Sequence, residues 1–330
     1  MRLSYICGLL LVCAGQVRAE EIRIEIAHGV QSLRVGSRTL TYADAPLHFD
    51  APLKVDGHEL PGSLDVFAGA GKTLNAVNSL DLEDYVAAVV GSEVPASWPA
   101  EALRAQAVAA RTFAVAQKIA QGAEARVHLG ASVLDQVYKG SAHPAPAALK
   151  AARDTSGEVL TYGAAPIAAY FSASCGGQSE SAEAAFHLAP GTTPYLVGGE
   201  PDEDQHAWTV KIPVAELDKA LRKRVGGEVR GLSVASRTGS KRANAMRVET
   251  SSGSRPLPAV ELRQLLGYQR LPSLLFEVEM SGGSAVFKGR GSGHGVGLCQ
   301  WGARGRALAG QGYRDILAHY YPGAEIRRMY

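Results

Sequence analysis

Hydrophobic and polar residues alternate along the first part of the chain. Between residues 21 and 80, apolar side chains recur at every second position in short runs that glycine or proline residues separate. A period of two places alternate side chains on opposite faces of a strand, and glycine and proline favour turns. The runs contain Ile22, Ile24 and Ile26; Leu33, Val35 and Leu40; and Leu47, Phe49, Leu53 and Val55. The pattern predicts an N-terminal β-rich region at residues 20–80, made of short antiparallel strands.

The period then changes to that of a helix. Valine residues recur near helical spacing before Pro95, and a proline disfavours helical backbone at the residue that precedes it. A second apolar run, rich in alanine, begins near Pro99 and carries an acidic residue in its first turn, as suits the start of a helix. We therefore expect two helices between residues 81 and 122, with Glu93 at the break between them.

Helical and strand patterns alternate through the rest of the chain. Residues 145–155 have a helical pattern, residues 159–174 are rich in strand formers, and residues 126–142 are typical of a loop. Later strands are predicted at Trp208–Ile212, Leu232–Ser236, Ala245–Thr250 and Phe276–Met280, and later helices at Val214–Arg224, Ala259–Leu266, Ala303–Gly310 and Tyr313–Tyr320. The predicted fold class is α+β with two lobes, in which short antiparallel strands surround an alanine-rich helical core.

The two lobes follow from a change of pattern near residue 208. Residues 81–207 are expected to form the lobe that contains Glu93, and residues 208–288 a second α+β lobe. Residues 289–330, a glycine-rich motif followed by helices, should then return to the first lobe and complete it.

The first 19 residues have the features of a secretory signal peptide. Arg2 supplies the positive end, residues 6–14 the apolar core, and Val17–Ala19 a small-x-small cleavage site. The apolar run is too short to span a membrane as a helix. We predict cleavage after this segment, export to the periplasm or cell envelope, and no transmembrane helix in the mature chain. Lipidation at Cys13 is a weaker alternative, because the valine before it fits poorly.

Removal of this segment leaves a formally neutral chain. It takes away two of the 34 basic residues, so that 32 face 32 acidic residues, a balance that gives no support for a nucleic-acid partner. Cys7 and Cys13 leave as well, whereas Cys175 and Cys299 remain. In an oxidising compartment an isolated pair is most simply a disulfide, and two buried thiols are the alternative.

Three sequence motifs lie in order along the chain. They are Glu83–Thr112, which contains Glu93-Val-Pro95; Ala169–Ser179; and Gly289–Ala303, which Ile316–Gly323 follows. Together they resemble the stage II sporulation protein D family, which includes the LytB-type amidase enhancers, over roughly residues 65–326. The resemblance implies lytic cleavage of peptidoglycan glycan strands, preferably strands stripped of their peptide stems. It also implies that Glu93 is the catalytic acid.

Glu93 is the candidate for acid–base chemistry. Glycosidic cleavage needs a proton donor at the leaving oxygen and stabilisation of an oxocarbenium-like transition state. A carboxyl group holds its proton near neutral pH only when its pKa is raised, and Val94, Pro95 and Trp98 could supply the apolar wall that does so. In a lytic transglycosylase the carboxylate then accepts the proton of the sugar's 6-hydroxyl, which gives a 1,6-anhydro end. The alternative is a glutamate that only caps or ion-pairs a helix end.

The glycine-rich motif surrounds His294. Its five glycines at residues 289–297 allow close backbone approach and offer N–H donors for sugar hydroxyls or a carboxylate. The motif lacks the strand–turn–helix setting of a dinucleotide site and the Gly-Lys-Ser/Thr of a phosphate loop. His294 is expected to bind sugar, to orient Glu93, or to hydrogen-bond the loop backbone.

The predicted substrate contacts come from all three motifs. They are Arg111, Tyr170, Ser174, His294, Gly295 and Gln300. The resemblance implies that Arg111 lies beside the acid and binds the anionic lactyl carboxylate of muramic acid, whereas a structural ion pair is the alternative. Tyr170 is expected in the cleft or in the core.

No metal or other cofactor is predicted. Family members that bind a metal bring histidine together with cysteine near the second motif, but Ser172 and Gln178 stand there in this chain. Zinc takes about four N, O or S ligands. A disulfide or close pair of Cys175 and Cys299 is therefore preferred over a zinc site that these residues would form with His294.

A binding protein is the main alternative to an enzyme. Amidase enhancers share the glutamate motif, so a protein that holds glycan without cutting it, and assists a cell-wall amidase or acts as a scaffold, would carry the same residues. A cysteine hydrolase is disfavoured, because export exposes a lone reactive thiol to oxidation.

Overall fold

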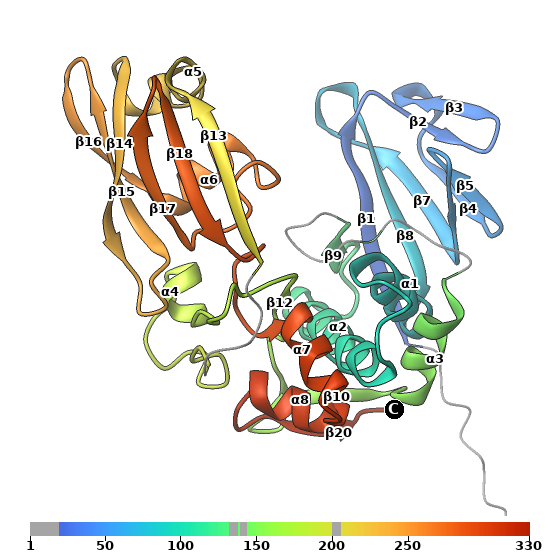
Figure 1. The fold of residues 1–330 in the computed structure, drawn as a ribbon. Coiled ribbons are helices and arrows are strands. Elements are labelled where there is room, and N and C mark those ends of the chain that lie inside the picture. The colour runs from blue at the N-terminus through green and yellow to red at the C-terminus, as the bar shows by residue number, and fades with distance from the viewer. Residues whose placement is uncertain (1–19, 132–137, 139–143, 200–205) are drawn as a thin grey trace, which may run out of the picture.

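The computed structural model describes residues 20–131, 138, 144–199 and 206–330. Helices and strands alternate along these residues and the strands form several small sheets, so the predicted α+β fold class is confirmed (Figure 1). The predicted signal peptide and most of the predicted loop at residues 126–142 lie outside the described residues. No helix in the described ranges is both long enough and apolar enough to cross a membrane.

The N-terminal region forms two sheets. Its elements are β1 (Glu21–Val30), β2 (Ser32–Val35), β3 (Arg38–Thr41), a 3-10 turn (Tyr42–Asp44), β4 (Leu47–Asp50), β5 (Leu53–Val55), β6 (His58–Leu60), β7 (Ser63–Ala68), a second 3-10 turn (Ala70–Lys72) and β8 (Leu74–Asp81). One sheet has the order β4-β7-β8-β1-β9 and the other β3-β2-β5-β6. All their pairings are antiparallel except that of β1 with β9 (Leu129–Gly130). The alternating pattern therefore predicted this region correctly.

Three helices follow: α1 (Leu82–Glu93), α2 (Ala100–Gln121) and α3 (Pro146–Asp154). The Asp81 carboxylate accepts hydrogen bonds from two backbone N–H groups in the first turn of α1, which stabilises that end of the helix. Val94 has extended backbone, as the proline after it requires. The break expected at Glu93 is thus present, and α2 packs against both α1 and α3.

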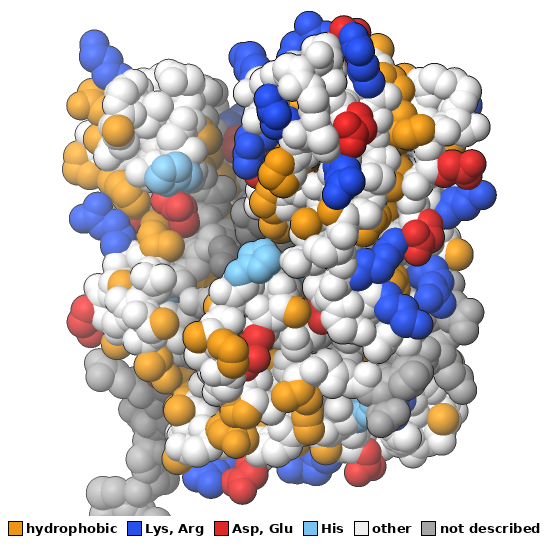
Figure 2. Space-filling model, turned by 90° about the vertical axis from the view of Figure 1, so that its left-hand side faces the viewer, with side chains coloured by type: hydrophobic (Ala, Val, Ile, Leu, Met, Phe, Trp, Pro, Cys, Tyr) orange, Lys and Arg blue, Asp and Glu red, His pale blue; other side chains and the backbone are white. Residues whose placement is uncertain are grey.

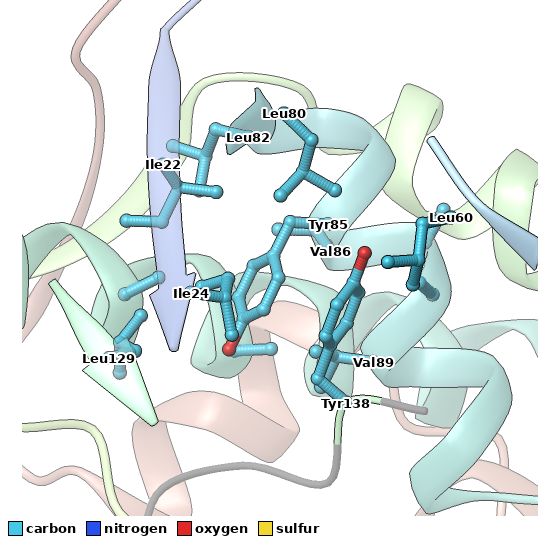
Figure 3. Close-up of a cluster of buried hydrophobic side chains, with 14 of the residues drawn as sticks. Ile22, Ile24, Leu60, Leu80, Leu82, Tyr85, Val86, Val89, Leu129 and Tyr138 are labelled. Atoms are coloured by element: carbon cyan, nitrogen blue, oxygen red, sulfur yellow. The ribbon is translucent and has the colours of Figure 1, made fainter. Parts of the chain in front are cut away.

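One hydrophobic core joins the N-terminal sheet to α1. Figure 3 shows Ile22 and Ile24 of β1 facing Val86 and Val89 of α1. Tyr138 lies in the same core, where its hydroxyl donates to Asn78 Oδ1 at 2.6 Å. Its aromatic ring therefore contributes to packing and not to a cleft.

The second and third motifs pack beside α2. They belong to a group of elements that comprises β10 (Glu158–Tyr162), β11 (Ala165–Pro166), β12 (Phe171–Ser172), α4 (Ala182–Phe186), β19 (Leu298–Cys299), α7 (Gln300–Leu308), α8 (Tyr313–Tyr320) and β20 (Glu325–Arg328). β12 pairs in parallel with β19, with Ser172 opposite Cys299, and β20 pairs with β10. These pairings place β19 and β20, near the C-terminus, beside β12 and β10 from the middle of the chain.

Residues 207–290 have a hydrophobic core of their own. The elements are β13 (Ala207–Pro213), α5 (Val214–Val225), β14 (Val229–Arg237), β15 (Ala243–Thr250), β16 (Gly253–Pro258), α6 (Ala259–Leu266), β17 (Phe276–Ser281) and β18 (Ser284–Arg290). They form two three-stranded sheets, β14-β15-β16 and β13-β18-β17. Strand β16 was not predicted, because it contains two prolines and buries only Leu257. Figure 1 shows this lobe beside the N-terminal sheets, with α2, α7 and α8 below both.

Candidate active site

Glu93 lines a cleft of about 1170 Å³ between the first and second lobes. The carboxylate stands on the last residue of α1 and is half-buried. The first-lobe wall includes Glu93, Tyr170 and His294, whereas the opposite wall includes Arg242 and Arg263. The cleft therefore joins the predicted acid to a lobe that is far from it in the sequence.

Gln300 holds the Glu93 carboxylate. It is the first residue of α7, and its Nε2 donates to Glu93 Oε2 at 3.1 Å and to Gln106 Oε1 at 3.3 Å. Gln300 is only 3% exposed and does not line the cleft. The predicted sugar contact is thus wrong for Gln300, because its amide is used to position the acid. Gln106 was missed, although a glutamine between the alanines and valines of the apolar run is a usable signal.

Aromatic rings form the wall beside Glu93. Tyr170 lies in the cleft, with its ring centre 4.8 Å from that of Phe186 and 5.6 Å from that of Phe113. The ring of His294 meets Phe186 edge-on at 5.4 Å. Such a wall is apolar and planar, which suits the faces of sugar rings.

His294 is a neutral imidazole that lines the cleft. Its Nδ1 accepts a hydrogen bond from the backbone N–H of Val296 at 2.9 Å. Burial, together with the positive charges of Arg263 and Arg242, lowers the pKa of His294 to about 4. The described hydrogen-bond partners of His294 are backbone groups of Val296 and of Phe171 in β12. Gln300, and not His294, is the residue that contacts the Glu93 carboxylate.

Acidification is expected to destabilise the fold through His294. Above the ordinary pKa of 6.5 the imidazole is neutral in the folded and unfolded states, but between pH 6.5 and pH 4 only the unfolded chain binds the proton. Stability from this residue is therefore intact above pH 6.5 and falls by up to about 3 kcal/mol as the pH decreases to 4. Urea unfolding at pH 7 and pH 5 measures the loss. His294→Asn, whose oxygen can still accept from Val296, should reduce it; an unchanged loss would contradict the prediction.

Gly295 and Ser174 hold the glycine-rich loop in place and do not line the cleft. The N–H of Gly295 donates to Ser172 Oγ at 3.2 Å, and its carbonyl accepts from the Glu180 N–H at 2.8 Å. The backbone of Ser174 exchanges two hydrogen bonds with Ser292. Both predicted substrate contacts are therefore wrong, because the polar groups involved are buried and bonded within the protein.

Gly295 is required by the close approach of Arg242. Its φ is +77°, and a Cβ at this position would lie 2.1 Å from Arg242 Nη2. A side chain here would have to displace a guanidinium that Cys175 and Ser240 hold, and it would strain the backbone at this φ.

Cys175 and Cys299 form a close pair. The backbone N–H of Cys175 donates to Cys299 Sγ at 3.1 Å, and both side chains are 1% exposed. The predicted proximity is confirmed, but the structure has buried thiols and no disulfide between them. Within the described residues, no three His, Cys, Asp or Glu side chains converge as a metal site would require.

Arg111 lies outside the cleft. It is fully buried on α2 and forms a bidentate ion pair with Glu83, with distances of 2.8 Å and 2.5 Å. The remaining donors reach the carbonyls of Ala152 and Glu158. The predicted contact with substrate is wrong for Arg111, because every part of the guanidinium is engaged inside the protein.

Comparison with known proteins places this site within a family. A model described as stage II sporulation protein matches residues 70–162, and a domain of unknown function matches residues 197–297. Stage II sporulation protein D of Bacillus subtilis is 33% identical over 282 residues, which cover 81% of this chain and 79% of that protein. An uncharacterized protein of Brachyspira hyodysenteriae is 34% identical over 276 residues, or 82% and 73% of the two chains.

The amidase enhancer of Bacillus subtilis is also similar, at 30% identity over 293 residues that cover 72% of this chain and 39% of that protein. The matches to both kinds of protein cover at least 72% of this chain, which is far more than the Glu93 motif. The chain therefore belongs to the stage II sporulation protein D family.

Proposed function

We propose that this protein is an exported lytic transglycosylase that cleaves peptidoglycan glycan strands in the periplasm or cell envelope. The main support is the setting of Glu93, a half-buried carboxylate in a large cleft, beside aromatic rings and held by Gln300 from a segment 207 residues away. Kinship with an amidase enhancer supports a function at the cell wall.

In the proposed reaction Glu93 acts twice. Its carboxyl group donates a proton to the glycosidic oxygen as the bond from that oxygen to C1 of the muramic acid breaks, which leaves an oxocarbenium-like C1 and a free hydroxyl on the departing sugar. The resulting carboxylate accepts the proton of the 6-hydroxyl, whose oxygen bonds to C1. The product is a 1,6-anhydro ring, and Glu93 regains its proton.

The carboxylates around the cleft favour this single-acid scheme. Hydrolysis by the common two-carboxylate mechanisms needs a second group as base or nucleophile. Of the described residues that line the cleft, only Glu93 and Glu180 carry a carboxylate. Glu180 is 4% exposed and accepts hydrogen bonds from Ser240 Oγ and the Ser181 N–H, so it is poorly placed to activate water.

A glycan-binding amidase enhancer or wall scaffold is the second candidate. The observation in its favour is the 30% identity to an amidase enhancer. Such a protein would use the same cleft to hold a strand while a cell-wall amidase acts on it.

Digestion of purified glycan strands separates the two candidates. The mature protein is incubated with strands stripped of peptide, and mass spectrometry determines the product ends. Transglycosylation produces 1,6-anhydromuramyl ends, which are one water lighter than hydrolysed ends. Binding of the strands without new ends, together with stimulation of an added amidase, would instead support the enhancer.

A further inference from the structure

The second lobe is strongly basic. Residues 208–288 contain 14 lysine and arginine residues against 7 aspartate and glutamate residues, although the chain without its first 19 residues is formally neutral. Figure 2 looks onto this side of the molecule and shows more Lys and Arg than Asp and Glu side chains on it. Three of these basic residues, Arg242, Arg263 and Arg270, line the cleft that contains Glu93.

Arg263 of α6 presents a positive charge to the cleft without a carboxylate partner. Its Nε donates to the Leu271 carbonyl at 2.8 Å and its Nη2 to the Pro272 carbonyl at 2.6 Å. No hydrogen bond from Nη1 occurs among the described residues, and no described carboxylate lies within 4.0 Å of the guanidinium. Burial lowers the pKa of Arg263 to about 10. The guanidinium also stacks on the ring of Tyr268, whose centre is 4.8 Å from its carbon. Its partners among the described residues are therefore neutral, and no described carboxylate neutralises its charge.

Arg242 adds a second charge to the same wall. It is 3% exposed and donates to the Cys175 carbonyl at 2.7 Å and to Ser240 Oγ at 2.8 Å. The nearby carboxylate of Glu180 accepts from the same Ser240 hydroxyl and offsets one positive charge. Of the two positive charges of Arg242 and Arg263, the Glu180 carboxylate therefore neutralises only one.

The surplus charge reaches the interior of the cleft. Arg263 and Arg242 both lower the pKa of His294, which stands on the opposite wall near Tyr170. Arg270 offers a contrast: it also lines the cleft, but Glu216 binds both of its terminal nitrogens. Of these three arginines, Arg263 is the one that combines a rigid guanidinium, an available donor and an uncompensated charge.

We propose that Arg263, supported by the field of Arg242, binds a carboxylate of the ligand and makes the cleft selective for anionic glycan. The identity of the ligand rests on the proposed function. In strands stripped of peptide the carboxylate is the lactyl group of muramic acid. In strands that carry peptide the lactyl group is an amide, and the carboxylates belong to the stem. Charge-assisted hydrogen bonds to arginine are strong enough to discriminate these forms.

Binding by a Glu93→Gln variant tests this without requiring cleavage. Isothermal titration uses three oligosaccharides: stripped muramyl glycan, the same glycan with its carboxylates converted to methyl amides, and peptide-bearing glycan. We expect the carboxylate form to bind at least about tenfold more tightly than the methyl amide. Adding Arg263→Gln should remove this difference, whereas Arg263→Lys should keep part of it and Arg270→Gln should leave it intact.

The ratio of the dissociation constants of the three ligands distinguishes direct binding by Arg263 from a structural role. Arg263 also donates hydrogen bonds to the carbonyls of Leu271 and Pro272. If its role were only structural, substituting it would weaken the binding of all three ligands equally. That result, or equal binding of carboxylate and methyl amide with Arg263 present, would overturn the proposal. Tight, Arg263-dependent binding of peptide-bearing glycan would support the subsite and assign its carboxylate to the stem. A protein that shows the expected ratio but never cleaves glycan would refute the proposed reaction and retain the subsite.

Discussion

Glu93→Gln should lower the cleavage of stripped glycan by at least about 100-fold, because an amide can neither donate nor recover the proton that the reaction needs. Glutamine has nearly the same shape, and its side chain can still meet the Gln300 amide that now bonds Glu93 Oε2. We therefore expect the fold and glycan binding to survive. The rate of formation of 1,6-anhydro ends is the measurement.

Glu183→Gln is the matched control for that substitution. Glu183 lies on α4, next to the cleft but outside its lining, and accepts a hydrogen bond from the Gly191 N–H that an amide oxygen can also accept. The control should cleave like the unaltered protein. A Glu93→Gln protein that cleaves at the normal rate would refute the mechanism, whatever the control does.

Arg111→Ala should destabilise the first lobe by about 3–5 kcal/mol, which is the usual effect of removing one partner from a buried ion pair. Burial alone would raise the pKa of Glu83. The hydrogen bonds and charge of Arg111, with further hydrogen bonds from Tyr330 and Gly157, instead hold that pKa below its ordinary value. Without Arg111 this carboxylate is left buried and uncompensated. Urea unfolding at neutral pH measures the loss.

Two further variants test the cause of that loss. Arg104→Ala removes a partly exposed arginine of α2 that pairs with Glu101 on the same helix and with Asp154 on α3, and it should cost no more than about 1 kcal/mol. Replacing Arg111 and Glu83 together with apolar residues should restore part of the stability. If the Arg111→Ala protein is stable but cleaves poorly, the structural role is contradicted and Arg111 would instead contact the substrate.

The elements that sequence patterns predicted well are those that local contacts determine. The period of two in β1 and the capped, proline-terminated α1 depend on residues only a few positions apart. Strand β16 escaped prediction because its exposed, proline-containing sequence has no alternating pattern, and it exists through pairing with β15. Its position at the edge of the sheet tolerates those prolines.

For the candidate site, the sequence by itself identified Glu93, the break that presents it, the proximity of the two late cysteines and the family. Only the tertiary structure decided which polar side chains face the cleft. Arg111 and Arg263 are both arginines on helices, yet one is enclosed by Glu83 and backbone carbonyls and the other lines the cleft. The physical reason is that burial and charge pairing depend on elements separated by many residues. The bond from Gln300 to Glu93, across 207 residues, cannot be inferred from local pattern.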